Sequence, residues 1–351
     1  MRTKRYAVTV LGSIVLLAAC GGDNAPTPAP TESPRPTPSP SPSPSPSPSP
    51  SPTSAAIAPY ELGTLSYTLD PGTPADKATA IRDAMDFAVS QSNTLGAFTG
   101  NVYVSYSAGT PTADASYRGT IRFGGTINRR VALHELAHWF GSGTTDEWGR
   151  LVSGGRFTGA RTTARIKAFD GPNAYLNADG QHFWPYGLNY DDEFFEAQRN
   201  TQIVSAQVFD MGLGEDATAA IAGNRRFQNR SSSKVLQAAA GSAPTQDASV
   251  AGSAQQWRVT YADGFITLAN LADGRMIEAS GDGNDAAATM AAATSSLTQQ
   301  WEMIPSGDGW FMLRNRSTRN CLDNKGNLAA GAAIRLGTCG QQASQQWRLI
   351  L

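Results

Sequence analysis

The spacing of apolar residues predicts a region of mixed helices and strands between about residues 59 and 215. Thr73 is a predicted helix cap and Pro74 a first-turn proline, and four apolar positions at helical spacing follow them, namely Ala78, Ile81, Met85 and Val89. Two strand patterns, each with glycines close by, cover residues 102–104 and 120–123. Helices and strands mixed in this way predict an α+β domain.

A second helical stretch runs from Asn128, a residue suited to capping it, to a stop at Gly141. Within it His134 and His138 flank Glu135 at the spacing HExxH, which places two imidazoles one helical turn apart on the same face. This arrangement suits a tetrahedral Zn²⁺ with one open position for water, and Glu135 would act as the general base. The chain has only 3 histidines, so this spacing predicts a zinc site.

A catalytic zinc site needs a third protein ligand, and the sequence offers several. His182, the remaining histidine, lies in an aromatic, turn-rich segment that could dock over the metal, and it is the predicted third ligand. The alternatives are carboxylates, namely Asp146, Glu193 and Glu196, the last two on a helix predicted over 192–211. Tyr186 is the predicted donor to the developing oxyanion, with Tyr190 as its alternative.

The HExxH motif resembles that of the zincin metallopeptidases, which implies a zincin-like fold that hydrolyses proteins or peptides with Zn²⁺ as cofactor. It follows the metzincin pattern HExxHxxGxxH as far as Gly141, but Thr144 stands in the place of the third histidine. Residues 143–149 resemble the aspzincin pattern GTxDxxYG, one residue shorter and with Trp148 for tyrosine. A glutamate ligand would resemble the gluzincins. The segment 120–125, ahead of the metal helix, is a candidate edge for a peptide added as an extra strand.

From about residue 224 the pattern changes to short strand-like runs separated by Gly, Asn and Asp turns. A Gln-x-Trp repeat occurs three times, at Gln255 and Trp257, at Gln299 and Trp301, and at Gln345 and Trp347. Each repeat would form one lobe unable to bury its own apolar face, so three lobes would pack around a pseudo-threefold axis with the tryptophans inside. This pattern resembles the ricin-type lectin β-trefoil over residues 224–351.

In ricin-type lectins a lobe binds sugar through an aspartate, an aromatic platform and an asparagine. The resemblance implies a candidate carbohydrate site in the last lobe at Asp323, with Ser344 in the asparagine's place and Gly337 in that of the platform. Gln237 and Glu278 take the aspartate's place in the first two lobes. A glycan is therefore a candidate ligand of the last lobe.

The first segment has a basic start, an apolar run over residues 7–17 and small residues before Cys20, a pattern typical of a secretion signal too short to span a bilayer. It resembles the lipobox of bacterial lipoproteins. The resemblance implies a signal peptide at 1–19, acylation of Cys20, and export to the cell envelope or surface with a lipid anchor in the membrane. Residues 20–58 are rich in Pro and Ser and predict a stiff linker that extends by roughly 3 Å per residue.

Composition narrows the remaining choices. A chain of 351 residues suits two domains with tails. With 16% charged residues and a net charge of −1, it carries no basic field that would hold a nucleic acid. In an oxidising compartment, Cys321 and Cys339 predict a disulfide.

The sequence thus predicts a multidomain protein, with an α+β zincin-like domain over 59–215 followed by an all-β trefoil over 224–351. The predicted function is a cell-envelope zinc peptidase whose trefoil directs it to glycans or glycoproteins. The alternative is a non-enzymatic surface adhesin or lectin with a structural metal domain.

Overall fold

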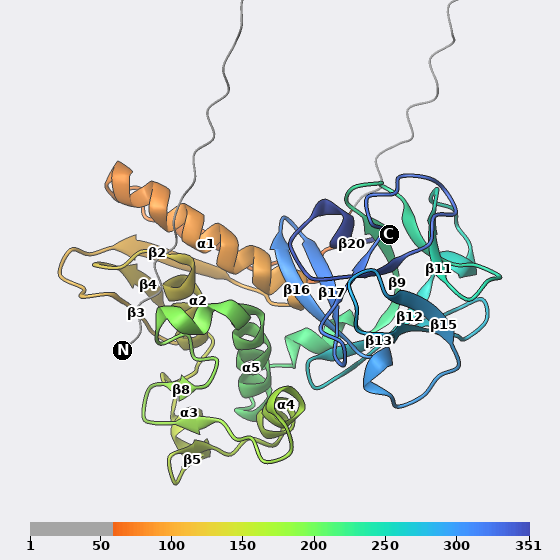
Figure 1. Cartoon of the computed structure of the whole chain (residues 1–351). Helices are drawn as coiled ribbons and strands as arrows, with labels where there is room; N and C mark the ends of the chain where they lie inside the picture. The colour runs from red at the N-terminus through yellow and green to blue at the C-terminus, as the bar shows by residue number, and fades with distance from the viewer. Residues whose placement is uncertain (1–58) are drawn as a thin grey trace, which may run out of the picture. The chain divides into compact units, whose positions relative to one another are not determined.

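The computed structural model describes residues 59–351, so the predicted signal peptide, Cys20 and the linker lie outside the described residues. Two hydrophobic cores form, one among helices and a sheet between Leu65 and Met211, the other mainly among strands after residue 220. Figure 1 shows these two groups of elements. The described residues nevertheless belong to a single compact unit. The two regions therefore have separate cores within one compact unit.

A four-stranded sheet in the order β1-β2-β4-β3 supports the first core. Its strands are β1 (Ser66–Leu69), β2 (Asn101–Tyr106), β3 (Ala113–Ala115) and β4 (Thr120–Phe123). Strands β1 and β4 run parallel to β2, and β3 is antiparallel to β4. Both predicted strands are confirmed. The prediction that 120–125 forms an edge is wrong, because β4 lies between β2 and β3 and the edge is β3.

Five α-helices belong to the first core region. They are α1 (Ala75–Leu95), α2 (Arg129–Trp139), α3 (Asp146–Leu151), α4 (Ala160–Asp170) and α5 (Ala197–Asp210). Helix α2 has the predicted start, because the side chain of Asn128 accepts a hydrogen bond from the amide of Val131 at 2.9 Å. Beyond its end Gly141 has a φ of +116°, and a Cβ there would lie 2.7 Å from Leu213, so both backbone and packing require glycine.

Two helix predictions need correction. Helix α1 begins at Ala75 with Pro74 in the N-cap position and without a side-chain cap, so Thr73 does not cap it. The helix predicted over 192–211 is divided into a 3₁₀ turn, η1 (Asp191–Glu196), and α5. The division places Glu193 and Glu196 in the turn, and their side chains project differently from those of a continuous helix.

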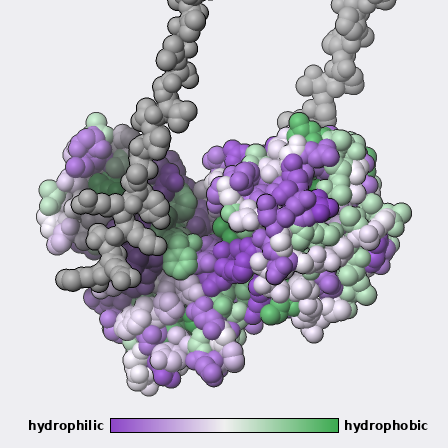
Figure 2. Space-filling model, viewed as in Figure 1, coloured by the Kyte–Doolittle hydropathy of each residue, from purple (hydrophilic) through white to green (hydrophobic). Residues whose placement is uncertain are grey.

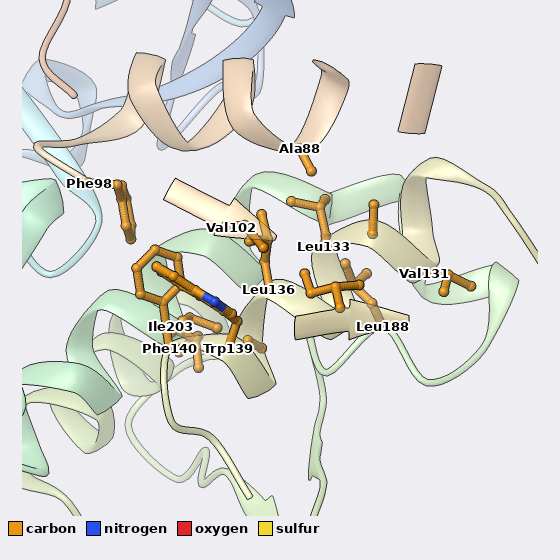
Figure 3. Close-up of a cluster of buried hydrophobic side chains, with 14 of the residues drawn as sticks. Ala88, Phe98, Val102, Val131, Leu133, Leu136, Trp139, Phe140, Leu188 and Ile203 are labelled. Carbon is orange, nitrogen blue, oxygen red and sulfur yellow. The ribbon is translucent and has the colours of Figure 1, made fainter. Parts of the chain in front are cut away.

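Helices α1, α2 and α5 pack together on the first sheet, and their contact is the core drawn in Figure 3. Leu133 and Leu136 lie on the face of α2 that packs into this core. Helical spacing places the motif histidines on another face of the helix. Leu188, which follows His182 in a loop, is also fully buried in the same core. Apolar packing thus holds both the helix with the HExxH motif and the segment after the predicted third ligand.

A second, small antiparallel sheet carries His182. It consists of β5 (Val152–Ser153), β6 (Arg156–Phe157), β7 (Asn177–Ala178) and β8 (Phe183–Trp184), in that order. His182 lies in the turn between β7 and β8. Trp148 is buried beneath this sheet, and its indole N–H donates to the carbonyl of Asp179 at 3.0 Å. The indole thereby ties the turn to α3.

The second core lies inside twelve strands. They are β9 (Gly223–Asn229), β10 (Val235–Ala238), β11 (Pro244–Asp247), β12 (Trp257–Ala262), β13 (Phe265–Asn270), β14 (Met276–Ser280), β15 (Ala287–Ala291), β16 (Trp301–Gly307), β17 (Trp310–Asn315), β18 (Cys321–Asp323), β19 (Arg335–Gly337) and β20 (Gln346–Ile350). The repeat tryptophans Trp257, Trp301 and Trp347 are each 0% exposed. Their burial confirms the predicted all-β region with its tryptophans inside.

The predicted disulfide between Cys321 and Cys339 is confirmed. It links β18 to the segment after β19 across a sequence separation of 18 residues. Closing a loop of this length stabilises the fold by about 3 kcal/mol in the chain-entropy treatment.

The surface in the view of Figure 2 mixes hydrophilic and hydrophobic residues. Among residues 59–351, no helix has the length and apolar character needed to cross a membrane.

Buried charges join the two cores. Glu302 on β16 is 0% exposed and forms ion pairs with Arg199 of α5 at 3.0 Å and Arg314 of β17 at 2.6 Å. Burial alone would raise the pKa of Glu302, but the charges of Arg314 and Arg199 outweigh it and lower the pKa from 4.5 to about 2.

This lowered pKa predicts acid sensitivity. A carboxylate with a depressed pKa in the folded state contributes stability above its unfolded pKa, and this stability is lost as pH falls from about 4.5 toward 2. We expect the urea midpoint of the full chain to fall between pH 5 and pH 3, and to fall less in Glu302→Gln. Equal pH dependence in the two proteins would contradict the assignment to Glu302.

Candidate metal centre

Three imidazoles converge between α2 and the β7–β8 turn. His134 and His138 lie one turn apart on α2, and their Nε2 atoms are 3.2 Å apart. The ring centroids of His182 and these two histidines are 5.4 and 5.5 Å apart, and one nitrogen from each ring lies within 4.8 Å of the others. Nitrogens bound to tetrahedral zinc lie about 3.3 Å apart, so the spacing within the α2 pair fits that ion.

Backbone carbonyls orient the two helical histidines. The Nδ1 atom of His134 lies 2.8 Å from the carbonyl of Gly187, and that of His138 lies 2.7 Å from the carbonyl of Ser142. A ring whose Nδ1–H donates to a carbonyl keeps Nε2 free as a lone-pair donor. The two Nε2 atoms therefore face each other in the form that binds a metal ion.

The turn with His182 is held close to the end of α2. The carboxylate of Asp179 accepts hydrogen bonds from the amides of Gln181 and His182 at 2.8 and 2.6 Å. Gly143 lies directly against this turn, because a Cβ there would approach the carbonyl oxygen of Gln181 to 1.9 Å. Gly143 also has φ of +70°, so both its backbone angle and the close approach of the turn require glycine. The turn with His182 can therefore pack close to the end of α2.

Burial sets the protonation of the site. It lowers the pKa of His134 to about 3, with the charge of His138 acting in the same direction, and it also lowers the pKa of His138. Both imidazoles are neutral at pH 7, which is the form required of a ligand. Burial raises the pKa of Glu135 to about 8, and the charge of Asp114 adds to the rise.

Glu135 has an unmatched buried atom. The residue is 3% exposed, and its Oε2 has no hydrogen-bond partner. A buried carboxylate without a partner is costly unless a cation or a water molecule compensates it. This orphan atom and the neutral imidazoles beside it fit a divalent cation and its water.

His134 and His182 open into a cavity of about 750 Å³. Its wall includes the edge strand β3 at Ala113, the motif residues His134 and Glu135, and the aromatic side chains of Trp184 and Tyr190. A cavity of this size accommodates several residues of an extended chain or a small ligand. A smaller cavity of about 420 Å³, between Phe98 and Leu213, lacks the motif residues.

The carboxylates proposed as alternative ligands lie outside the histidine group. Among the described residues, the grouping of candidate ligands contains three histidines only. Asp146 is exposed at the start of α3. The carboxylate of Glu193 lines the cavity but accepts hydrogen bonds from backbone amides of its own turn, and Glu196 pairs with Arg314.

The assignment of Tyr186 as oxyanion donor needs correction. Its hydroxyl donates to Asp170 at 2.7 Å and accepts from Arg199 at 2.8 Å. Tyr186 is absent from the cavity wall, whereas Tyr190, the alternative, lines it and is 73% exposed. The available aromatic hydroxyl is therefore that of Tyr190.

Sequence reasoning missed Arg130. It precedes His134 by one helical turn and lines the cavity, and its guanidinium donates to the carbonyl of Leu188 at 2.6 Å and to Asp191. Arg130 and His134 are four residues apart on α2, and this spacing alone predicts that the two side chains are neighbours on one face of the helix. The loop partners of Arg130 could not be read from the sequence.

The three lobes of the second core repeat one hydrogen-bond pattern. The indole N–H groups of Trp257, Trp301 and Trp347 donate to the carbonyls of Leu236, Ile277 and Leu322. The amides of the repeat glutamines bind the residues in the aspartate's place, Gln255 to Gln237, Gln299 to Glu278 and Gln345 to Asp323. The repeat residues are therefore scaffold.

The candidate sugar residues in the last lobe take part in this scaffold. Asp323 is 4% exposed and accepts hydrogen bonds from Gln345 and from the amide of Lys325. A Cβ at Gly337 would lie 2.5 Å from Asp323, so the platform position is filled by the aspartate itself. The carbonyl of Ser344 accepts from the side chain of Asn229. These contacts give both candidates a structural role.

The fold and the repeated lobes define a β-trefoil. Residues 223–347 match the family described as the ricin-type beta-trefoil lectin domain, and this part of the chain is such a domain. No curated protein matches the chain.

Several solved structures resemble part of the chain. The Rhizoctonia solani agglutinin is 24% identical, with a TM-score of 0.32, and the match covers 37% of this chain and 94% of the agglutinin. The Macrolepiota procera ricin B-like lectin in complex with lactose is 15% identical, with a TM-score of 0.34, over 36% of this chain and 94% of the lectin. An exo-beta-1,3-galactanase from Clostridium thermocellum is 20% identical, with a TM-score of 0.35, over 36% of this chain but only 30% of the enzyme.

Proposed function

We propose that this protein is a zinc-dependent peptidase whose ricin-type trefoil directs it to glycans or glycoproteins. The observation that carries the proposal is the convergence of His134, His138 and His182 beside the buried carboxylate of Glu135. A ligand set of three neutral imidazoles leaves zinc one open position, as catalytic zinc sites do. When bound, zinc would supply Lewis acidity toward a water molecule and a substrate carbonyl.

Glu135 is the proposed proton carrier. Its Oε2 has no protein partner, so the carboxylate is free to take a proton from the attacking water and to pass it to the leaving amine. A nearby cation favours the ionised carboxylate and opposes the rise in pKa that burial causes. The hydroxyl of Tyr190, at the cavity wall, is the proposed hydrogen-bond donor to the developing oxyanion.

An extended peptide is the proposed substrate because an edge strand borders the site. Strand β3 pairs with β4 on one side only, and its residue Ala113 lines the cavity. A peptide added antiparallel to this edge would gain main-chain hydrogen bonds and bring a carbonyl to the histidines. The edge is only three residues long, so side-chain contacts would have to supply part of the binding.

The proposal is tested by metal analysis paired with a casein or gelatin digest of the purified full chain. We expect about one zinc per chain and hydrolysis that a chelator stops and added zinc restores. Screening the same protein against immobilised glycans tests the role of the trefoil.

A lectin or adhesin with a structural metal site is the second candidate function. The match of residues 223–347 to a lectin domain family favours it. A zinc-loaded chain that binds glycans but hydrolyses neither casein nor gelatin would favour this candidate.

We further propose export with a lipid anchor on Cys20, on the basis of the lipobox-like sequence before it. A thioether-linked lipid requires the cysteine sulfur, so Cys20→Ser should abolish lipidation in a bacterial host. Metabolic labelling with a fatty-acid analogue measures this. Label that persists in the variant would place the lipid on another residue.

A further inference from the structure

Helix α5 lies between the two cores and is buried along most of its length. Every residue from Ala197 to Val208 is buried, including a run of polar residues at its start. These polar groups need internal partners, because an unpaired buried polar group is costly. Some of these partners belong to the trefoil, and others belong to the loop after His182.

Arg199 has partners in both regions. Its Nε donates to Glu302 of the trefoil at 3.0 Å, and its Nη1 donates to the hydroxyl of Tyr186 at 2.8 Å. Both Arg199 and Glu302 are deeply buried, at 6% and 0% exposure. A planar guanidinium held by a buried carboxylate has little freedom to turn, so it places the tyrosine hydroxyl in one position.

Tyr186 in turn borders the carbonyl that orients a motif histidine. Gly187, the next residue, presents its carbonyl to Nδ1 of His134 at 2.8 Å. Tyr186 and Leu188 on either side of it have φ of 69° and 58°. Non-glycine residues adopt such angles at a cost, so outside contacts must hold this stretch of backbone.

The contacts that hold it come largely from α5. The hydroxyl of Tyr186 is fixed by Arg199, and its carbonyl accepts from the side chain of Asn200 at 2.8 Å. Asp170 of α4 accepts the hydroxyl proton at 2.7 Å. Two hydrogen bonds of Arg199, followed by the covalent link from Tyr186 to Gly187, therefore connect Glu302 in the trefoil to the carbonyl behind His134.

We propose that Glu302 of the trefoil, acting through Arg199 and Tyr186, is a positioning residue for the metal centre. The trefoil then completes the metal site and is more than a separable targeting module. This inference rests on the proposed metal centre. It predicts that a substitution inside the lectin domain alters zinc binding although the substituted residue does not touch the histidines. The effect would act through the orientation of His134.

The test uses the full chain and measures zinc affinity by competition with a chromophoric chelator. Glu302→Gln removes the nearest of the three carboxylate charges that hold Arg199, the others being those of Asp170 and Glu196. Tyr186→Phe removes only the hydroxyl that Arg199 binds. We expect each variant to bind zinc about 10-fold more weakly, as loss of supporting hydrogen bonds behind metal ligands does. The visible spectrum of the Co²⁺-loaded protein should change in both, because it reports ligand geometry.

Glu278→Gln is the matched control. It is the same substitution elsewhere in the second lobe, where Glu278 binds the repeat glutamine Gln299, and the first lobe has Gln237 at the equivalent place. This variant should change the zinc affinity less than twofold and leave the cobalt spectrum unchanged. Tyr186→Phe keeps the test decisive if Glu302→Gln does not fold.

Combining the two changes tests the route. If Glu302 acts through Tyr186, the double variant should lose less affinity than the product of the two single losses. Zinc affinity and cobalt spectrum unchanged in folded Tyr186→Phe would overturn the positioning role while the metal centre stands. A wild-type chain that binds no zinc would overturn the proposed metal centre, and the positioning role with it.

Discussion

Replacing Glu135 with glutamine is expected to leave zinc bound and to lower kcat for peptide hydrolysis by about 10²- to 10⁴-fold. The side chain is buried beside the histidines, and its Oε2 has no protein partner, so its proposed task is to move a proton. An amide of the same shape cannot accept that proton at neutral pH. Turnover on a casein-derived peptide, with zinc content measured on the same samples, checks the prediction.

Two comparisons make this result specific. Asp114, whose charge raises the pKa of Glu135, forms an exposed ion pair with Arg122, and Asp114→Asn should change kcat far less than Glu135→Gln. Full turnover in Glu135→Gln with zinc bound would rule out Glu135 as the general base. Loss of zinc together with turnover would assign the residue a role in metal binding instead.

Replacing His182 with alanine is expected to weaken zinc binding by about 10²- to 10⁴-fold. Structural zinc sites in zinc-finger peptides bind the ion with about 10–16 kcal/mol, and on that scale losing one of three protein ligands removes about 3–5 kcal/mol. The reason lies in the geometry, since a nitrogen of His182 comes within 4.8 Å of one from each helical histidine. Competition with a chelator at pH 7 measures the loss.

Asp146→Asn is the control for this experiment, because Asp146 was an alternative third ligand and is exposed at the start of α3. Its zinc affinity should match that of the wild-type chain. Tight binding in His182→Ala combined with weak binding in Asp146→Asn would favour an aspzincin-like site over one with three histidines.

Features that depend on neighbouring residues were predictable. The motif histidines share a face of α2 because helical periodicity alone aligns residues four apart. Asn128 caps the same helix by accepting a hydrogen bond from the amide of Val131, three residues further along the chain. The trefoil was predictable for another reason. Each of the three lobes with a Gln-x-Trp sequence makes the same buried contacts, so the repeat in the sequence predicts the repeat in the structure.

Features that depend on how distant segments pack were predicted poorly. Tyr186 was chosen for its closeness to His182 in sequence, but a loop with two left-handed residues turns its hydroxyl toward Arg199. The segment 120–125 is the predicted edge because it is strand-like and precedes the HExxH helix, but the edge of the first sheet is the short strand β3. Strand order is a tertiary property, and three residues carry too little periodicity to reveal it.

The sequence by itself determined the HExxH helix, the three lobes with their buried tryptophans and the disulfide between Cys321 and Cys339, because each follows from local periodicity, repetition or a single pairing. The tertiary structure alone decided that His182 reaches the motif, that Tyr190 lines the cavity, and that the trefoil binds α5 through Glu302. These three depend on contacts between segments far apart in the chain. Their formation is decided by burial and by pairing of charges across the whole fold, which no local pattern encodes.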